Sequence, residues 1–395
     1  MGQNLPPLLM FYILSFLLCG ISFAPLAIQE LDIWHAQGIF AQGMILIALS
    51  WSFFEKPKRL LVKNVPLGLL NLWIGIQTLY ICYLSQVNSK YDVKHFFLYF
   101  NFLCLLILYN LIVQYLNKDN IIKILGYLRY VVIITLFTCV LQRFNLSQFF
   151  KLLIDMEGTP EAYWLHNNPV IGFIGNGTHL SGFLACTIPI FLWHGKREDY
   201  LALILMGLIL CQAGTTIGDP SISGFAIAFV VWIYLIKRNK LALVWTGLLA
   251  IVGFFIVKDF LPNNFFGGSG RLSIYGYYLK VFAKQPVTGL GLGTVNIIYT
   301  YSPFPQARHV HMEYLQYGVE TGIIGLVLIG NLVNDFFHKV AIDKVSLCLK
   351  ACVLGFLVSC CFNYPSHLWL PATWAFSFYA FFISINRKEI YHGVK

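Results

Sequence analysis

Residues 96–116 read FFLYFNFLCLLILYNLIVQYL, an uncharged apolar run long enough for one transmembrane helix. A helix needs about 20 apolar residues to cross the roughly 30 Å hydrocarbon core of a bilayer. Similar runs recur along the chain, so we expect an all-α, polytopic integral membrane protein with about 12 transmembrane helices. The expected spans lie near residues 7–27, 38–54, 66–86, 96–116, 123–141, 178–194, 200–216, 221–237, 241–258, 313–334, 346–364 and 369–386.

The composition supports a membrane protein. Hydrophobic residues make up 58% of the 395 residues and charged residues only 11%, whereas soluble domains carry roughly 25% charged residues. We therefore expect residues 1–395 to form a single membrane domain. Residues 7–28 lack a preceding basic segment and are expected to be a retained span, not a signal peptide. The formal net charge of +10 does not indicate a nucleic-acid partner, because no basic cluster sits on a soluble module.

Basic residues occupy alternate connections between the expected spans. Such connections face the cytoplasm in membrane proteins, so both termini are predicted to be cytoplasmic. The residues that carry this signal are Lys56, Lys58, Arg59, Lys63, Lys118, Lys123, Lys196, Arg197, Lys237, Arg238, Lys240, Lys339, Lys344, Arg387 and Lys388. The opposite face carries two longer loops, residues 142–177 and 259–312. Long connections are often functional, and the second loop is expected to contain the active site.

The second long loop contains basic, glycine and histidine residues that face away from the basic side. A basic loop is often only a solvated connection, but clustering with two histidines favours a binding role. The residues concerned are Gly270, Arg271, Lys280, Lys284, Pro286, Gly289, Gly291, Gly293, Arg308, His309 and His311.

His311 precedes an apolar helix. On that helix His311, Leu315, Gly318, Gly322 and Gly325 would form one stripe, whose small residues let another helix approach closely. A helix N-terminus disfavours a cation, so we expect a neutral His311 that can accept a proton as a general base. The alternative is a structural role for His311 as a cap or interface anchor.

Two acids and three glycines complete the candidate site. Glu313, in the first helical turn, is expected to stabilise the helix dipole. Glu320 lies about nine residues into this segment, roughly 13 Å at 1.5 Å per residue, where a charge is costly without a partner. We expect it to pair with an arginine or a polar cavity. Gly289, Gly291 and Gly293 would admit backbone close to a phosphate, although alternating glycines are also common in ordinary loops.

Motifs for metal and nucleotide chemistry are absent from the sequence. It contains no HExxH, no paired Cys/His ligands, no DxD and no GxxxxGK[ST]. The ten cysteines all fall in apolar runs without CxxC spacing and are expected to be packing residues. We therefore expect metal-independent chemistry without a cofactor.

Residues 270–330 resemble the segment shared by bacterial O-antigen ligases and O-antigen polymerases. The pattern of that family has an arginine followed by a helix, then a proline and Gly-x-Gly-x-Gly, then a histidine followed after nine or ten residues by GxxG. The matching positions here are Arg271, Pro286, Gly289, Gly291, Gly293, His311, Gly322 and Gly325. Residues 172–189, GFIGNGTHLSGFLACTIP, are similar to the family's glycine- and asparagine-rich entry into a middle span. The first half of the chain matches only as generic spans.

Two positions depart from the family pattern. Met312 stands where ligases usually carry Asn, Ser or Gln, so a hydrogen-bonding partner is missing. Residues 221–223 read Ser-Ile-Ser where many members carry a Ser-Arg pair. The expected diphosphate-binding arginine is absent there, and Arg143, Arg308 or a lysine would have to replace it.

The resemblance implies glycosyl transfer on the periplasmic face of the bacterial inner membrane, as in lipopolysaccharide biosynthesis. The donor would be a glycan on undecaprenyl diphosphate, the acceptor a hydroxyl of a lipid such as lipid A core or of a saccharide, and membrane lipids the surroundings. Arg271 with Arg308, Lys280 or Lys284 would stabilise the departing diphosphate. His311 would deprotonate the hydroxyl, with His309 as alternative base or phosphate ligand.

Two rival functions remain open at this stage. The nearest is a polysaccharide polymerase that joins repeat units from similar donors. The other is a flippase or transporter of lipid-linked sugar, in which basic residues bind diphosphate but no bond forms. Transport predicts charged or broken helices near the bilayer midplane, whereas the titratable residues here gather at one face.

Overall fold

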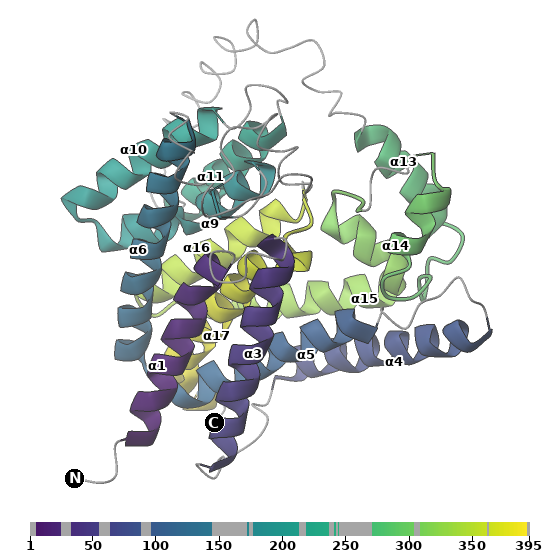
Figure 1. The fold of residues 1–395 in the computed structure, drawn as a ribbon, viewed down its shortest axis with the longest axis horizontal. Helices are drawn as coiled ribbons and strands as arrows, with labels where there is room; N and C mark the ends of the chain where they lie inside the picture. The colour runs from purple at the N-terminus through teal and green to yellow at the C-terminus, as the bar shows by residue number, and fades with distance from the viewer. Residues whose placement is uncertain are drawn as a thin grey trace, which may run out of the picture.

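The protein is a helical bundle in which every regular element among the described residues is a helix (Figure 1). The computed structural model describes residues 5–24, 33–54, 64–87, 96–143, 172–173, 177–212, 219–236, 241, 244, 271–303, 309–361 and 363–392. The helices are α1 (Leu5–Gly20), η1 (Ile21–Phe23), α3 (Ile33–Phe54), α4 (Val65–Val87), α5 (Phe96–Tyr115), α6 (Lys118–Arg143), α9 (Gly177–His194), α10 (Arg197–Gln212), α11 (Asp219–Ile236), α13 (Arg271–Phe282), α14 (Val295–Ile298), η5 (Tyr299–Tyr301), α15 (Glu313–His338), α16 (Lys344–Ser359), η6 (Pro365–His367) and α17 (Trp369–His392).

The helices confirm the expected helical class, and each expected span except 241–258 coincides with one of them. Within residues 241–258 only Leu241 and Val244 are described. By length and composition, five described helices can cross a membrane: α3, α4, α5, α6 and α15. The helical, membrane-type character is therefore established, while 12 crossings stay a prediction.

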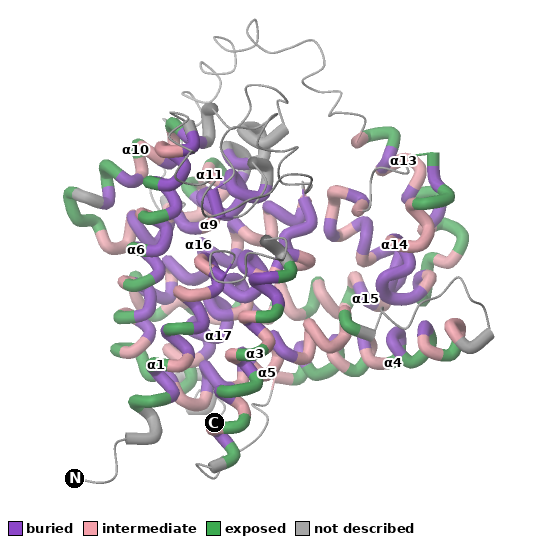
Figure 2. The backbone as a smooth tube through the Cα atoms, viewed as in Figure 1, coloured by how far each residue is buried: buried purple, intermediate pink, exposed green. Residues whose placement is uncertain are grey.

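One large core holds most of the bundle together. It joins buried side chains of α1, α3, α5, α6, α9, α10, α16 and α17 with the C-terminal half of α15, and Figure 2 shows the buried positions concentrated where these helices meet. Many apolar residues of α4 stay exposed, such as Leu72 and Leu79. Exposed apolar faces on long helices suit contact with lipid.

Helix ends that the charge pattern places on one face do meet in the structure. Lys118 lies 2.5 Å from Asp343, and the Ser384 hydroxyl donates to the Leu116 carbonyl at 2.6 Å. These residues flank connections that were all assigned to the cytoplasmic side. The contacts support the alternation of the helices, and which face is cytoplasmic stays a prediction.

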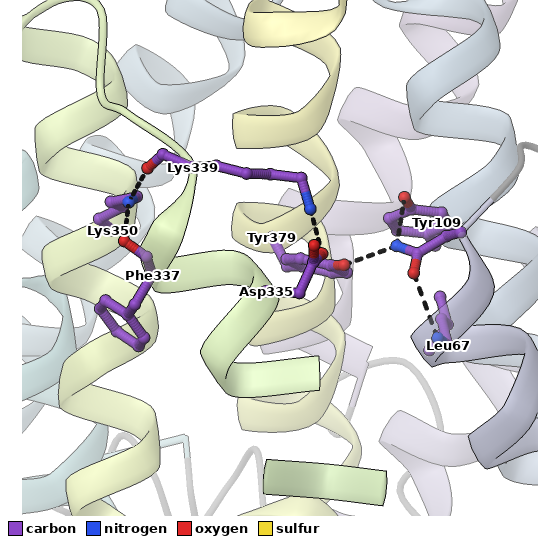
Figure 3. Close-up of polar contacts among 8 residues, drawn as sticks. Leu67, Tyr109, Asp335, Phe337, Lys339, Lys350 and Tyr379 are labelled. Carbon is purple, nitrogen blue, oxygen red and sulfur yellow. Dashed lines mark hydrogen bonds and ion pairs between the residues drawn. The ribbon is translucent and has the colours of Figure 1, made fainter. Parts of the chain in front are cut away.

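A buried lysine caps the C-terminal end of α15 (Figure 3). The Lys350 ammonium donates to the carbonyls of Phe337, at 3.0 Å, and of Lys339. It also lies over the Phe336 and Phe382 rings, 5.6 and 5.1 Å from their centroids. A cation is favourable at this end of a helix, where carbonyls lack intrahelical donors. Lys350 thus has a structural explanation.

The expected loop 259–312 contains folded structure. Its described part forms α13, α14 and η5, and α13 begins at Arg271, as the family pattern implies. Ile274, Tyr278 and Val281 of α13 share a small core with Val295 and with the first turns of α15. The segment is therefore a cap packed on α15. Of the other long loop, 142–177, only residues 142–143, 172–173 and 177 are described.

Helix α15 is broken at Gly322, whose backbone angles are φ 69° and ψ −171°. The loop after α13 satisfies the main-chain groups freed by the break. The N–H groups of Leu290 and Gly291 donate to the carbonyls of Val319 and Glu320 at 2.9 and 2.8 Å, and the N–H of Ile323 donates to the Pro286 carbonyl at 2.8 Å. A break in a membrane helix requires such internal partners, because lipid offers none.

Candidate active site at the N-terminal end of α15

Four histidines from three separate segments surround the buried Tyr364 ring. The His309 ring stacks on it, with centroids 4.0 Å apart and 19° between the planes. His179 of α9 meets it edge-on at 4.6 Å and His311 at 5.3 Å. The His367 ring lies 6.5 Å from Tyr364 and 5.2 Å from His309. The bundle thus gathers several proton-transfer groups at one place.

His309 is held in its neutral form. Burial lowers its pKa well below the usual value, and the charges of His367, His311 and His179 lower it further. Its Nδ1 has no hydrogen-bond partner among the described residues. A neutral imidazole with an unpaired ring nitrogen can accept or donate a hydrogen bond without first losing a proton.

His311 has a strained main chain and lies outside the helix on which the sequence placed it. Its φ of 58° is the only positive value of a non-glycine residue in the described part of the chain, and α15 begins two residues later at Glu313. The expected stripe is therefore wrong at this end, and Gly322 interrupts it further along. The Tyr275 hydroxyl donates to the His311 carbonyl at 3.1 Å. Strain of this kind often marks a functional residue.

Arg271 belongs to the same cluster. It is half-buried at the first turn of α13. Arg271 and His311 both lie close enough to His179 to interact with it electrostatically. The structure therefore brings together the two residues predicted to be catalytic, Arg271 and His311, with the predicted substrate-binding residue His309. His179 joins them, although the family resemblance covered only its segment, residues 172–189, and did not predict a role for this histidine.

The other predicted cations are not brought to this cluster. Lys280 and Lys284 are exposed, and Lys280 lies nine residues beyond Arg271, roughly 13 Å further along a helix. Arg308 lies outside the described residues, as does the side chain of Arg143. Of the cations proposed to bind diphosphate, Arg271 is the one that the described structure places beside the histidines.

The predicted phosphate-binding glycines support the break in α15. A Cβ at Gly289 would lie 2.5 Å from the Glu320 carbonyl, and one at Gly322 would lie 2.2 Å from the Val287 carbonyl. Both glycines have positive φ, as do Gly291 and Gly293. We name residues 286–291 together with the break at Gly322 the glycine clasp. The Gly291 N–H donates to the Glu320 carbonyl of α15. It is therefore already bonded within the protein and is not free to bind a phosphate.

Glu320 is completely buried. Its carboxylate accepts a long hydrogen bond of 3.5 Å from the Gln316 amide, and the N–H groups of Gly293 and Val295 face it. The expected polar surroundings are present, but no arginine is among the partners recorded for the described residues. The same Gln316 amide nitrogen also lies 3.1 Å from His367 Nε2 and so links Glu320 to the histidine cluster.

An interaction between Glu313 and His367 was not predicted from the sequence. The Glu313 carboxylate lies 2.7 Å from His367 Nδ1 and accepts from both the hydroxyl and the main-chain N–H of Ser366. The Tyr317 hydroxyl lies 2.7 Å from that of Ser366. Burial alone would lower the pKa of His367, but the Glu313 carboxylate raises it above its usual value. Residues 365–368 join two spans on the face of the long loops, and that placement was the available signal.

This acid–histidine pair opens onto a cavity of about 210 Å³. Glu313, Tyr317, Ser366 and His367 form its polar end, and its walls are mainly apolar residues of α4, α5, α15, α16 and α17, such as Leu105. The cavity therefore has a polar end and an apolar body.

The fold and the site together define a helical membrane protein with a buried histidine cluster beside an amphipathic cavity. No protein-family model matches the chain, and no curated protein matches it either. The resemblance to O-antigen ligases and polymerases therefore rests on the quoted residues alone.

Proposed function

We propose that the chain is a membrane glycosyltransferase, similar to O-antigen ligases, that moves a glycan from polyprenyl diphosphate to a hydroxyl acceptor. The proposed location is the periplasmic face of a bacterial inner membrane. The observation that carries the proposal is the gathering of His311, His309 and His179 around Tyr364, with Arg271 close enough for its charge to influence His179. Transfer requires a cation and a base beside the same reacting carbon.

In the proposed reaction the acceptor oxygen attacks the anomeric carbon of the donor sugar. His311 takes the proton of that hydroxyl as the new carbon–oxygen bond forms. The bond between the anomeric carbon and the diphosphate breaks, and its electron pair leaves with the diphosphate. Arg271 stabilises the leaving group through charge-assisted hydrogen bonds. The neutral, partly unpaired His309 supports a second role, either as the base or as a phosphate ligand.

A polymerase that joins repeat units uses the same donor and the same chemistry, and it is the nearest alternative. The two functions differ in the acceptor, so the size of the product separates them. A ligase attaches one finished glycan to each acceptor, whereas a polymerase forms a ladder of increasing length.

A flippase for lipid-linked sugar is a second candidate, favoured by the broken helix α15 and its buried Glu320. Transporters often use such breaks to bind substrate with freed main-chain groups. Here the groups at the break already bind the glycine clasp and the Trp73 indole, which donates to the Thr321 carbonyl at 3.1 Å. Because these groups are occupied, the glycosyltransferase is the better-supported function.

The deciding experiment measures glycan transfer from a lipid-linked donor in membranes with equal amounts of each variant. We expect Arg271→Ala and His311→Ala to lower kcat by about 100-fold or more, the usual contribution of a positioned proton-transfer group or oxyanion stabiliser. His338→Ala and Arg197→Ala change the same residue types at exposed positions and should transfer normally. Normal transfer by both cluster variants would refute the site. Movement of donor across the bilayer without product would establish the flippase.

A further inference from the structure

We infer that the cavity beside Glu313 binds a neutral lipid alcohol, whose hydroxyl lies against Glu313 and His367 and whose hydrocarbon chain fills the apolar body. The inference rests on the proposed function in one respect, since this alcohol would be the glycan acceptor. The binding site itself is argued from the shape and the chemistry of the cavity.

The apolar body suits a hydrocarbon chain. A second cavity of about 100 Å³ shares five wall residues with the first, Leu332, Val333, Phe356, Leu357 and Phe376, and extends to Phe336. The two cavities thus adjoin between α15, α16 and α17. Together they reach about 310 Å³, at the lower end of ordinary ligand pockets, which begin at roughly 300 Å³. An apolar space between several membrane helices favours a hydrocarbon chain over a sugar.

The polar end suits a hydroxyl and disfavours an anion. Among the described lining residues there is no lysine or arginine, and the Glu313 carboxylate at this end already pairs with His367, 2.7 Å away. A hydroxyl can donate a hydrogen bond to that carboxylate. A phosphate would instead meet a like charge in surroundings of low dielectric, where repulsion is strong.

The cation of the site lies elsewhere. Arg271 acts on His179, which meets the Tyr364 ring at 4.6 Å, whereas the His367 ring lies 6.5 Å from that ring. Arg271 does not line the cavity. A diphosphate beside Arg271 and an alcohol beside Glu313 would therefore occupy separate subsites, and His309, stacked on Tyr364, lies 5.2 Å from the His367 ring of the alcohol subsite.

The experiment uses the whole protein in lipid nanodiscs with two photoreactive probes of equal chain length, a diazirine-bearing dodecyl alcohol and its phosphate monoester. We expect the alcohol to label peptides of α15 and α17, with competition by unlabelled dodecanol and weak labelling by the phosphate. Equal labelling by both probes would overturn the inference, as would alcohol labelling that unlabelled dodecanol does not reduce. This comparison needs only the wild-type protein, so it does not depend on the folding of a variant.

A substitution that fills the cavity, compared with a matched control, locates the binding site. Leu332 lines both cavities, so Leu332→Trp should lose most of the specific labelling. Val327→Trp places the same side chain at a half-exposed position of the same helix, outside both cavities, and should label as the wild type does. Glu313→Gln should raise labelling by the phosphate relative to the alcohol. Undiminished labelling of Leu332→Trp would place the alcohol elsewhere.

The binding result and the transfer result can fail separately. If the wild type binds the alcohol but forms no glycan product, the lipid-alcohol site stands and the glycosyltransferase proposal falls. If the wild type transfers glycan but Leu332→Trp leaves the KM for the acceptor unchanged, the glycosyltransferase stands and the cavity is not the acceptor site.

Discussion

Replacing Gly322 with alanine tests whether the glycine clasp is a requirement of the fold. Gly322 has φ 69° and ψ −171°, a region that is essentially restricted to glycine and costs other residues about 1–3 kcal/mol. The new Cβ would lie 2.2 Å from the Val287 carbonyl oxygen, so the clasp must move. Loss of the hydrogen bond from Ile323 to Pro286 adds about 1 kcal/mol. The expected loss of unfolding free energy is about 3 kcal/mol.

The matched control is Gly330→Ala on the same helix. Nothing lies within 4 Å of a Cβ at Gly330, and alanine in a helix is favoured over glycine by about 1 kcal/mol. The assay is equilibrium unfolding in mixed detergent micelles, with hydrogen exchange at Ile323 as a local measure. We expect Gly322→Ala to be destabilised and its Ile323 amide to exchange faster, while Gly330→Ala is unchanged or slightly stabilised. Equal stability of the two variants, with unchanged exchange at Ile323, would refute the clasp.

Two further predictions concern buried charges. Arg129→Met leaves the buried Asp199 carboxylate without the guanidinium 2.8 Å away and should cost about 3 kcal/mol in the same unfolding assay; Arg197→Met at an exposed position should cost almost nothing, and equal losses would contradict the role of the pair. Glu313 raises the pKa of His367 in the folded protein. The stabilisation by this pair is therefore fully present when the pH is below the pKa of histidine in the unfolded chain, about 6.5. That stabilisation is lost as pH rises through the folded pKa, so the difference in stability between wild type and Glu313→Gln should shrink above pH 6.5, and a constant difference would refute the pairing.

The sequence predicts the helices well because their signal is local. The run at residues 96–116 has only one way to avoid water and satisfy its main chain in lipid, and α5 forms there. The same reasoning cannot find a break such as Gly322, since hydropathy is unaffected by one non-helical residue. The break depends on the loop at residues 286–291, which arrives from a distant part of the chain.

The same contrast between local and long-range signals explains why only part of the site was predicted. Arg271 and His311 carry a recognisable spacing, and the structure places both near His179. His367 and Tyr364 give no signal in their own segment, because their importance comes from the histidines that α9 and α15 bring beside them. Glu313 was interpreted as a helix-stabilising acid because its partner, His367, lies 54 residues away and is joined to it only by the packing of α15 against η6.

The glycine clasp fixes the position of α13 relative to α15, and both helices contribute residues to the site. The clasp follows α13 directly, so the hydrogen bonds of Leu290 and Gly291 to α15 fix the helix that begins with Arg271. The same half of α15 carries Glu313 at its first turn. Arg271 and Glu313, which we propose to lie beside the diphosphate and the incoming hydroxyl, therefore belong to two helices that the clasp joins. A catalytic geometry must be held to within about 0.5 Å, and a continuous α15 could not bind the clasp that holds it.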